Sequence, residues 1–147
     1  MKRRHFVVSL LIPFGARAQG FSSPADPAKW IGEITGGSTP EKSGIEIEMP
    51  QIAENGNAVP LHIRVASPMT SGDHVKAIHV FAERNPRPRV ATFHLGPDAG
   101  RADITTRVRL GGTQNVTVLA ELSGGRWRVA AQNVLVTTGA CLDEGSL

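Results

Sequence analysis

The chain has 147 residues, of which 20% are charged and 40% hydrophobic, a balance that suits one folded domain and excludes a disordered chain. Its net charge of +3 depends on four basic residues within positions 1–18. Without them, 12 basic and 13 acidic residues remain, about −1, and the main argument for nucleic-acid binding disappears. No later apolar stretch is long enough to span a membrane.

Residues 1–18 have the layout of an export signal. A basic start at Lys2, Arg3 and Arg4 precedes an apolar run over 6–15, and Ala16-Arg17-Ala18 forms a small-x-small cleavage site. We therefore predict a periplasmic protein. The start also resembles a twin-arginine signal, and both this route and ordinary Sec export stay open.

Residues 19–43 are predicted to form a short helix and a polar loop. Asp26 can cap a helix that begins at Pro27, and Gly36-Gly37 ends it. Three apolar side chains share one helix face: Trp30, Ile31 and Ile34. This face docks either onto the domain itself or onto a partner.

Residues 44–137 predict a β-sandwich. Apolar and polar residues alternate along short segments that turn residues separate, as in Val59, Leu61, Ile63 and Val65. About seven strands result, with a connection over 50–57 and a bulge at 131–133: 45–49, 59–66, 75–83, 90–95, 102–110, 116–122 and 127–137. Steady spacing and frequent Gly and Pro favour an all-β, antiparallel, immunoglobulin-like fold.

Few residues outside the C-terminal segment suggest chemistry. His62, His79 and His94 alternate with apolar neighbours and are predicted to face solvent, and no histidine pair has metal-ligand spacing. A metal site built from distant strands would make the protein an enzyme, which is the weakest of the hypotheses. The loop over 84–89 holds three arginines, and it is either solvated or receives an anion or an acidic partner surface.

Cys141 is the only cysteine, and it lies in a C-terminal arm over 138–147. An exported protein with one cysteine cannot form an internal disulfide, so the thiol is reactive or pairs with another chain. Gly139 and Ala140 are small and are predicted to make the arm flexible. Cys141 lies four positions after Thr137, a reach of about 13 Å when extended. Asp143 and Glu144 disfavour the thiolate, which fits a carrier better than a catalyst.

The sequence resembles the SoxY family, the sulfur-carrying subunit of the periplasmic thiosulfate-oxidising Sox system. The similarity runs from about Trp30 to Cys141. The segments that carry it are Met49–Gly56 with Val59-Pro60, Ser67-Pro68-Met69, Asn85-Pro86-Arg87-Pro88 with Val90–Phe93, and Thr106–Leu110 with Thr113-Gln114.

The resemblance implies a non-catalytic carrier that pairs with a SoxZ-like subunit as a heterodimer or a larger assembly. It implies that Cys141 holds the substrate sulfur covalently while Sox enzymes load, hydrolyse and oxidise the adduct. It implies no cofactor and no resident metal.

The arm departs from the family pattern. The family ends in Gly-Gly-Cys-Gly-Gly, whereas this chain has Gly139-Ala140-Cys141-Leu142-Asp143 and four further residues. Two alternatives therefore stay open beside the thiosulfate carrier. One is a divergent SoxY paralogue that carries another sulfur species. The other is a non-catalytic periplasmic interaction module whose cysteine links chains or does nothing.

Overall fold

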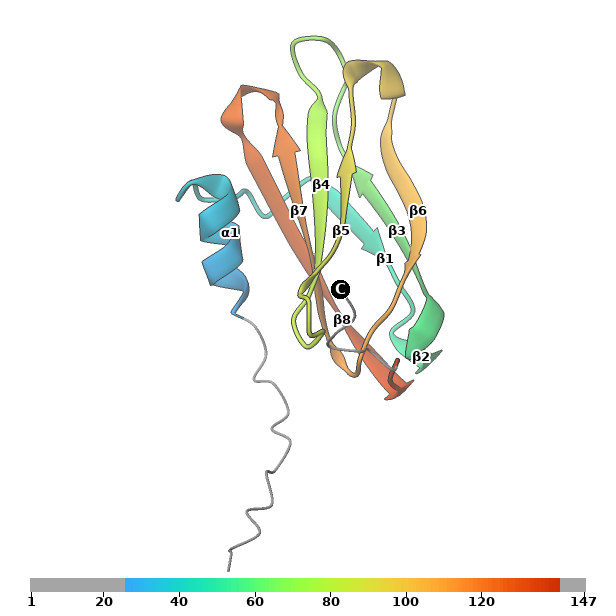
Figure 1. Ribbon diagram of the computed structural model, residues 1–147. Coiled ribbons are helices and arrows are strands. Elements are labelled where there is room, and N and C mark those ends of the chain that lie inside the picture. The colour runs from blue at the N-terminus through green and yellow to red at the C-terminus, as the bar shows by residue number, and fades with distance from the viewer. Residues whose placement is uncertain (1–25, 141–147) are drawn as a thin grey trace, which may run out of the picture.

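Two β-sheets pack face to face in the computed structural model, which describes residues 26–140 (Figure 1). The three-stranded sheet is antiparallel and has the order β1 (Ile45–Glu48), β3 (Val59–Val65) and β6 (Ala102–Val108). The five-stranded sheet has the order β2 (Ile52–Asn55), β8 (Trp127–Thr138), β7 (Gln114–Leu122), β4 (Val75–Ala82) and β5 (Arg89–His94). Three short 3₁₀ turns join strands: η1 (Gly56–Ala58), η2 (Pro97–Ala99) and η3 (Ser123–Gly125).

The core lies between the sheets and follows the alternation in the sequence. Every second residue of β3, from Val59 to Val65, is buried. Val116 and Val118 of β7 face it from the other sheet and are fully buried. The prediction of an immunoglobulin-like sandwich is therefore confirmed. Removal of these side chains from water is the main force that holds the two sheets together.

β2 is a strand that the sequence analysis treated as a connection. Its residues Ile52–Asn55 pair in parallel with β8, with Ile52 opposite Leu135 and Asn55 opposite Thr138. The predicted antiparallel sandwich of about seven strands therefore has β2 as an eighth strand, which pairs in parallel with β8. Four residues close to Pro50 are too few to show the alternation that predicts a strand. They form a strand because they pair with the edge of β8.

The predicted bulge at 131–133 is absent from β8. Ala131, Gln132 and Asn133 pair in unbroken register with β7. The inward Gln132 side chain donates to the Met49 carbonyl oxygen, so the polar residue is satisfied without a local distortion. The register shifts instead in β4, between Val80 and Phe81 and between Val75 and Ala77.

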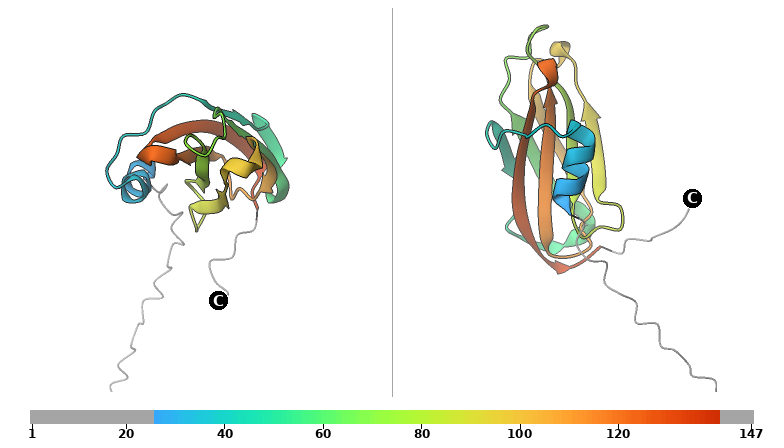
Figure 2. Two further views of the ribbon diagram at one scale, coloured as in Figure 1. Left: turned by 90° about the horizontal axis from the view of Figure 1, so that it is seen from above. Right: turned by 90° about the vertical axis from the view of Figure 1, so that its left-hand side faces the viewer.

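Helix α1 (Pro27–Thr35) covers the outer face of the five-stranded sheet (Figure 2). Asp26 accepts a hydrogen bond from the Ala28 N–H at 2.9 Å, and Gly36 ends the helix at a φ of 62°, as predicted. The Trp30 ring stacks on Phe81 with ring centroids 4.1 Å apart. The apolar face of the helix therefore docks onto its own domain.

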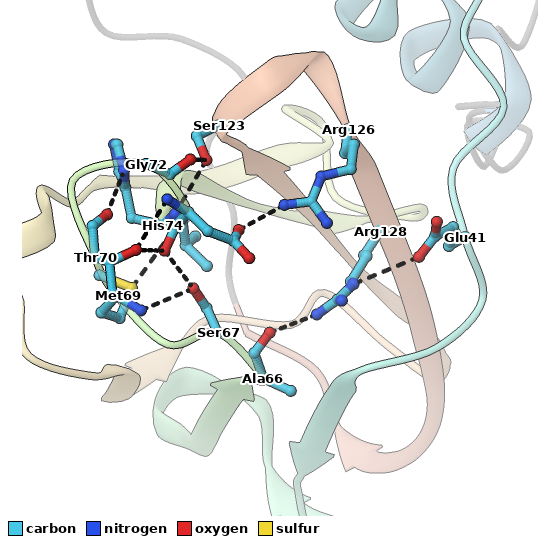
Figure 3. Close-up of polar contacts among 12 residues, drawn as sticks. Glu41, Ala66, Ser67, Met69, Thr70, Gly72, His74, Ser123, Arg126 and Arg128 are labelled. Carbon is cyan, nitrogen blue, oxygen red and sulfur yellow. Dashed lines mark hydrogen bonds and ion pairs between the residues drawn. The ribbon is translucent and has the colours of Figure 1, made fainter.

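The two ends of the sandwich are built from different loops. At one end, the loop from Ser67 to His74 is tied to the β7–β8 turn through Ser123, and Arg126 pairs with Asp73 (Figure 3). The opposite end holds η1, the loop after β4, the loop after β6 and the end of β8. Over residues 26–140, no helix has the length and apolarity required to cross a bilayer.

Candidate functional site

The candidate attachment site, Cys141, lies just outside the described residues, as do the predicted export signal and the acids of the arm. The structure does show where the arm begins. β8 ends at Thr138, and Gly139 and Ala140 are the last described residues. The surroundings of these two residues therefore define the site that the structure can describe, which we call the arm base.

Gly139 and Ala140 are anchored at the arm base. The Ala140 N–H donates to the Leu110 carbonyl oxygen at 2.9 Å, and Ala140 is only 9% exposed. A Cβ atom on Gly139 would lie 2.4 Å from the Gly111 carbonyl oxygen, so only glycine fits there. The prediction that Gly139 and Ala140 make the arm flexible does not fit these contacts. The reach of about 13 Å counted from Thr137 therefore includes residues that the sandwich holds.

Two buried amide side chains hold the loop against which the arm packs. Asn85 is 8% exposed; its Nδ2 donates to the Arg109 carbonyl oxygen at 2.8 Å, and its Oδ1 accepts from the Gly111 N–H at 3.0 Å. Gln114 is 3% exposed and donates to Asn85 Oδ1 at 3.0 Å and to the Gly112 carbonyl oxygen at 3.1 Å. A buried amide network of this kind fixes backbone position, because breaking it leaves polar groups unpaired.

Gly56 and Thr113 complete the arm base. The Leu110 N–H donates to the Gly56 carbonyl oxygen at 2.8 Å, and a Cβ on Gly56 would lie 2.2 Å from the Leu110 oxygen. The Thr113 hydroxyl accepts from the Val136 N–H at 3.0 Å, which ties the end of β8 to the same loop. The arm therefore leaves the sandwich from one defined place.

Several segments that carry the family resemblance meet at the arm base. Gly56, Asn85, Leu110 and Gln114 come from three segments far apart in the sequence, and the hydrogen bonds above join them. Sequence analysis quoted these residues but gave them no role. In proteins generally, Asn and Gln side chains are mostly exposed, so nothing in the local pattern predicted that Asn85 and Gln114 would be buried together.

The Ser67-Pro68-Met69 segment lies at the opposite end of the sandwich. Met69 is buried at 6% exposure and has a φ of 50°, a left-handed conformation that is uncommon for a residue with a side chain. Its sulfur accepts from the Val75 N–H, and its own N–H donates to the Ser67 hydroxyl (Figure 3). This segment shapes the fold and has no contact with the arm base.

His62 is half-buried on the outer face of the three-stranded sheet, between two carboxylates. Its Nε2 lies 2.6 Å from Asp103 Oδ1 and its Nδ1 lies 3.2 Å from Glu48 Oε2. The hydrogen bond to Asp103, followed by that to Glu48, raises the pKa of His62, and the same bonds lower the pKa values of both carboxylates. Arg64 pairs with Glu48 as well, so this is a compensated charge network.

His79 does not face solvent, so that prediction was wrong. The residue points away from the sandwich core, as the alternation required, but it is only 9% exposed and lies beside Phe81 and Trp127 on the face that α1 covers. Its Nδ1 lies 3.2 Å from the Thr92 hydroxyl. Burial lowers the pKa of His79, so the neutral ring is the form the site favours. His94, by contrast, is exposed as predicted.

Metal-ligating side chains do not gather in the part of the chain that the structure describes. Over residues 26–140, no three side chains of His, Asp or Glu are arranged to hold a metal ion. The histidines at His62, His79 and His94 lie on separate strands, and each has its own local partners or solvent.

Fold and arm together define a class: a single immunoglobulin-like sandwich whose C-terminal segment carries one cysteine and starts from a rigid base. The sequence matches the family described as sulfur oxidation protein SoxY over residues 31–141. The chain belongs to this family. The match ends at Cys141, so it includes the candidate site.

Solved structures agree with the family. The chain is similar to the sulfur carrier protein SoxY from Chlorobium limicola f thiosulfatophilum, with 32% identity, 75% of this chain and 94% of that chain covered, and a TM-score of 0.60. It also shares its fold with the superoxide reductase neelaredoxin from Ignicoccus hospitalis, at 14% identity, 64% and 80% coverage and a TM-score of 0.58. That likeness concerns the fold alone. No curated protein matches the sequence.

Proposed function

We propose that this protein is a covalent carrier of sulfur intermediates, with Cys141 as the attachment site. The observation that supports the proposal most is that the family match extends through the only cysteine of the chain. The rigid arm base adds to it, because a carrier must present its cargo from a reproducible place. The protein itself supplies the thiol and its position, and partner enzymes supply the chemistry.

The proposed cycle begins with the thiol and thiosulfate. A partner oxidase joins the Cys141 sulfur to the sulfane sulfur of thiosulfate, and one proton and two electrons leave, the electrons to the oxidase. Hydrolysis by a second enzyme then uses one water, releases sulfate and two protons, and leaves a persulfide anion on Cys141. A partner oxidoreductase then accepts six electrons from the outer sulfur of the persulfide while three waters supply its oxygens and six protons leave, which gives an S-sulfonate on Cys141. Hydrolysis of this S-sulfonate with one water releases sulfate and one proton and restores the thiol. A divergent arm that carries another sulfur species is the alternative form of the same role.

We further propose that the protein works in the periplasm, to which residues 1–18 direct it, and that it pairs there with a SoxZ-like subunit. The family supports partners from the Sox system in general. Ile52 and Leu135 are adjacent on β2 and β8 and are 59% and 46% exposed, so they are a natural place to look for the subunit contact.

Intact-mass analysis tests the carrier role. Protein purified from cells growing on thiosulfate should carry sulfur-containing mass additions on Cys141, and reduction should remove them. Cys141→Ser should abolish both the additions and thiosulfate oxidation while leaving subunit binding unchanged. A protein without any sulfur addition in such cells, or a serine variant that still supports oxidation, would favour the interaction module instead.

A further inference from the structure

Helix α1 is held on the outer face of the five-stranded sheet by apolar packing. Over residues 26–140, no hydrogen bond or ion pair joins the helix to a strand, and Trp30 reaches the sheet by stacking on Phe81. The packing beside this contact is incomplete. A cavity of about 200 Å³ is lined by Trp30 and Ile34 from the helix and by Phe81 and Arg89 from the strands. Because protein interiors leave few spaces of this size, the helix is bound less firmly than an element of the core.

Three polar atoms are buried in this region and have no hydrogen-bond partner among residues 26–140. They are Trp30 Nε1 and Thr35 Oγ1 of the helix and His79 Nε2 of β4. A polar atom that loses water and gains no hydrogen bond lowers the stability of the arrangement that buries it. Release of the helix would let water reach these atoms, so the docked position is opposed by its own polar groups.

The segment after α1 lets the helix move while it stays attached. Gly36 and Gly37 have φ values of 62° and 87°, in the left-handed region that glycine adopts without strain. The chain is fixed again at Glu41, whose N–H donates to the Trp127 carbonyl oxygen and whose carbonyl oxygen accepts from the Val129 N–H, both at 2.9 Å. The two glycines therefore form a hinge between a weakly held helix and the edge of β8 (Figure 2).

His79 lies on the face that the helix covers. It is 9% exposed, and Leu119, its partner in the β4–β7 register, is fully buried on the same face. Phe81 and Trp127 flank the His79 ring, with ring centroids 6.4 and 6.3 Å away. Burial is the largest cause that lowers the pKa of His79, so a proton on this ring opposes the closed arrangement.

Charged groups approach His79 from the strands on either side of it. Arg89 and His94 of β5 lower its pKa, whereas Glu121 of β7 raises it. The Glu121 carboxylate is itself paired with Lys76 of β4. The helix carries two charged side chains, and both are exposed: Lys29 and Glu33. The net direction of the pKa is down, so water stabilises the protonated ring better than its protein neighbours do.

We propose that α1 is a pH-sensitive latch: protonation of His79 releases the helix from the five-stranded sheet and uncovers the face that contains Phe81 and Leu119. Deprotonation lets the helix dock again. In the open state His79 is wetted and has its ordinary pKa, so this state binds the proton more tightly than the closed state, and acid favours opening. The stability of the closed state is therefore complete above about pH 6.5, the ordinary pKa of histidine, and falls as the pH drops below it.

The latch goes beyond the carrier role, and only one link between them rests on the proposed function. The proposed cycle releases protons as thiosulfate becomes sulfate, so the signal that opens the latch is a product of the reaction that the carrier serves. The latch itself requires no adduct on Cys141.

Amide hydrogen exchange of the full chain, followed residue by residue by NMR, tests the latch. Exchange rates are divided by the intrinsic rate at each pH, which gives a protection factor for every amide. A free helix of nine residues is marginal in water, so the α1 amides lose protection once the helix is released. From about pH 7.5 to about pH 5, their protection should fall, by at most tenfold per pH unit because one proton is involved. The β7 amides should keep more of their protection, because the sandwich stays folded.

Two variants and a matched control identify the titrating group. His79→Gln removes the ring that takes up the proton, and α1 protection should then no longer depend on pH. His94→Gln makes the same change at an exposed histidine of the neighbouring strand, and it should retain the fall. His79→Met is a second uncharged replacement, which keeps the test open if the glutamine variant does not fold. Thermal unfolding verifies that each variant is folded.

Three outcomes would overturn the proposal. In the first, α1 protection in the unaltered protein stays constant over this pH range. In the second, it falls equally in the unaltered protein and in the His79 variants, so that another group responds to acid. In the third, α1 and β7 lose protection equally, so that acid loosens the whole sandwich. None of these measurements needs sulfur loading, so a missing adduct on Cys141 would refute the carrier role alone.

Discussion

Replacing Gly139 by alanine tests whether the arm base really fixes the start of the arm. The added Cβ would lie 2.4 Å from the Gly111 carbonyl oxygen and 3.0 Å from its carbon, both backbone atoms that cannot swing aside. Relief requires a shift of about 1 Å, because non-bonded carbons prefer separations near 3.5 Å. Overpacking of this kind costs about 1–3 kcal/mol. Gly139 lies at the end of the sandwich, however, so the overpacking can be relieved when the hydrogen bond between Ala140 and Leu110 breaks.

The expected result is therefore local. The free energy of unfolding in urea should fall by about 1 kcal/mol, and the Ala140 amide should exchange about 5- to 10-fold faster as its bond to Leu110 is lost. Gly112→Ala is the matched control in the same loop, because its Cβ would meet nothing within 4 Å. Equal behaviour of the two variants in both measurements would refute the claim that Gly139 is required by its contact with Gly111.

Three further predictions concern residues away from the arm itself. Asn85→Ala leaves buried groups unpaired around Arg109 and should cost about 2–4 kcal/mol by urea unfolding; a cost below that of an exposed Asn133→Ala control would contradict it. Trp30→Ala removes the ring stacked on Phe81, should cost about 1–3 kcal/mol, and should raise the pKa of His79 toward its ordinary value in an NMR titration. The raised pKa of His62 stabilises the fold at acidic pH, an effect that is lost as pH rises through that pKa. The melting temperature of the native protein should therefore approach that of His62→Gln from about pH 5.5 to about pH 8.5, and a constant difference would count against it.

His79 shows why a period-two pattern predicts direction but not exposure. The alternation correctly placed its side chain on the face away from the sandwich core. That face is buried because α1, some fifty residues earlier in the chain, lies on it. β2 illustrates the same limit for strands, since its four residues pair only because β8 offers a free edge. In both cases the deciding partner is distant in the sequence.

Local patterns alone determined the sandwich class, most strand positions, and the start and end of α1, because side-chain alternation and capping act between near neighbours. The segments quoted between Met49 and Gln114, together with the C-terminal Cys141, also sufficed to indicate the family. Only the tertiary structure decided that Gly56, Asn85 and Gln114 meet where the arm begins. Those contacts join residues 24 or more positions apart in the sequence, and no local rule relates residues across such a separation.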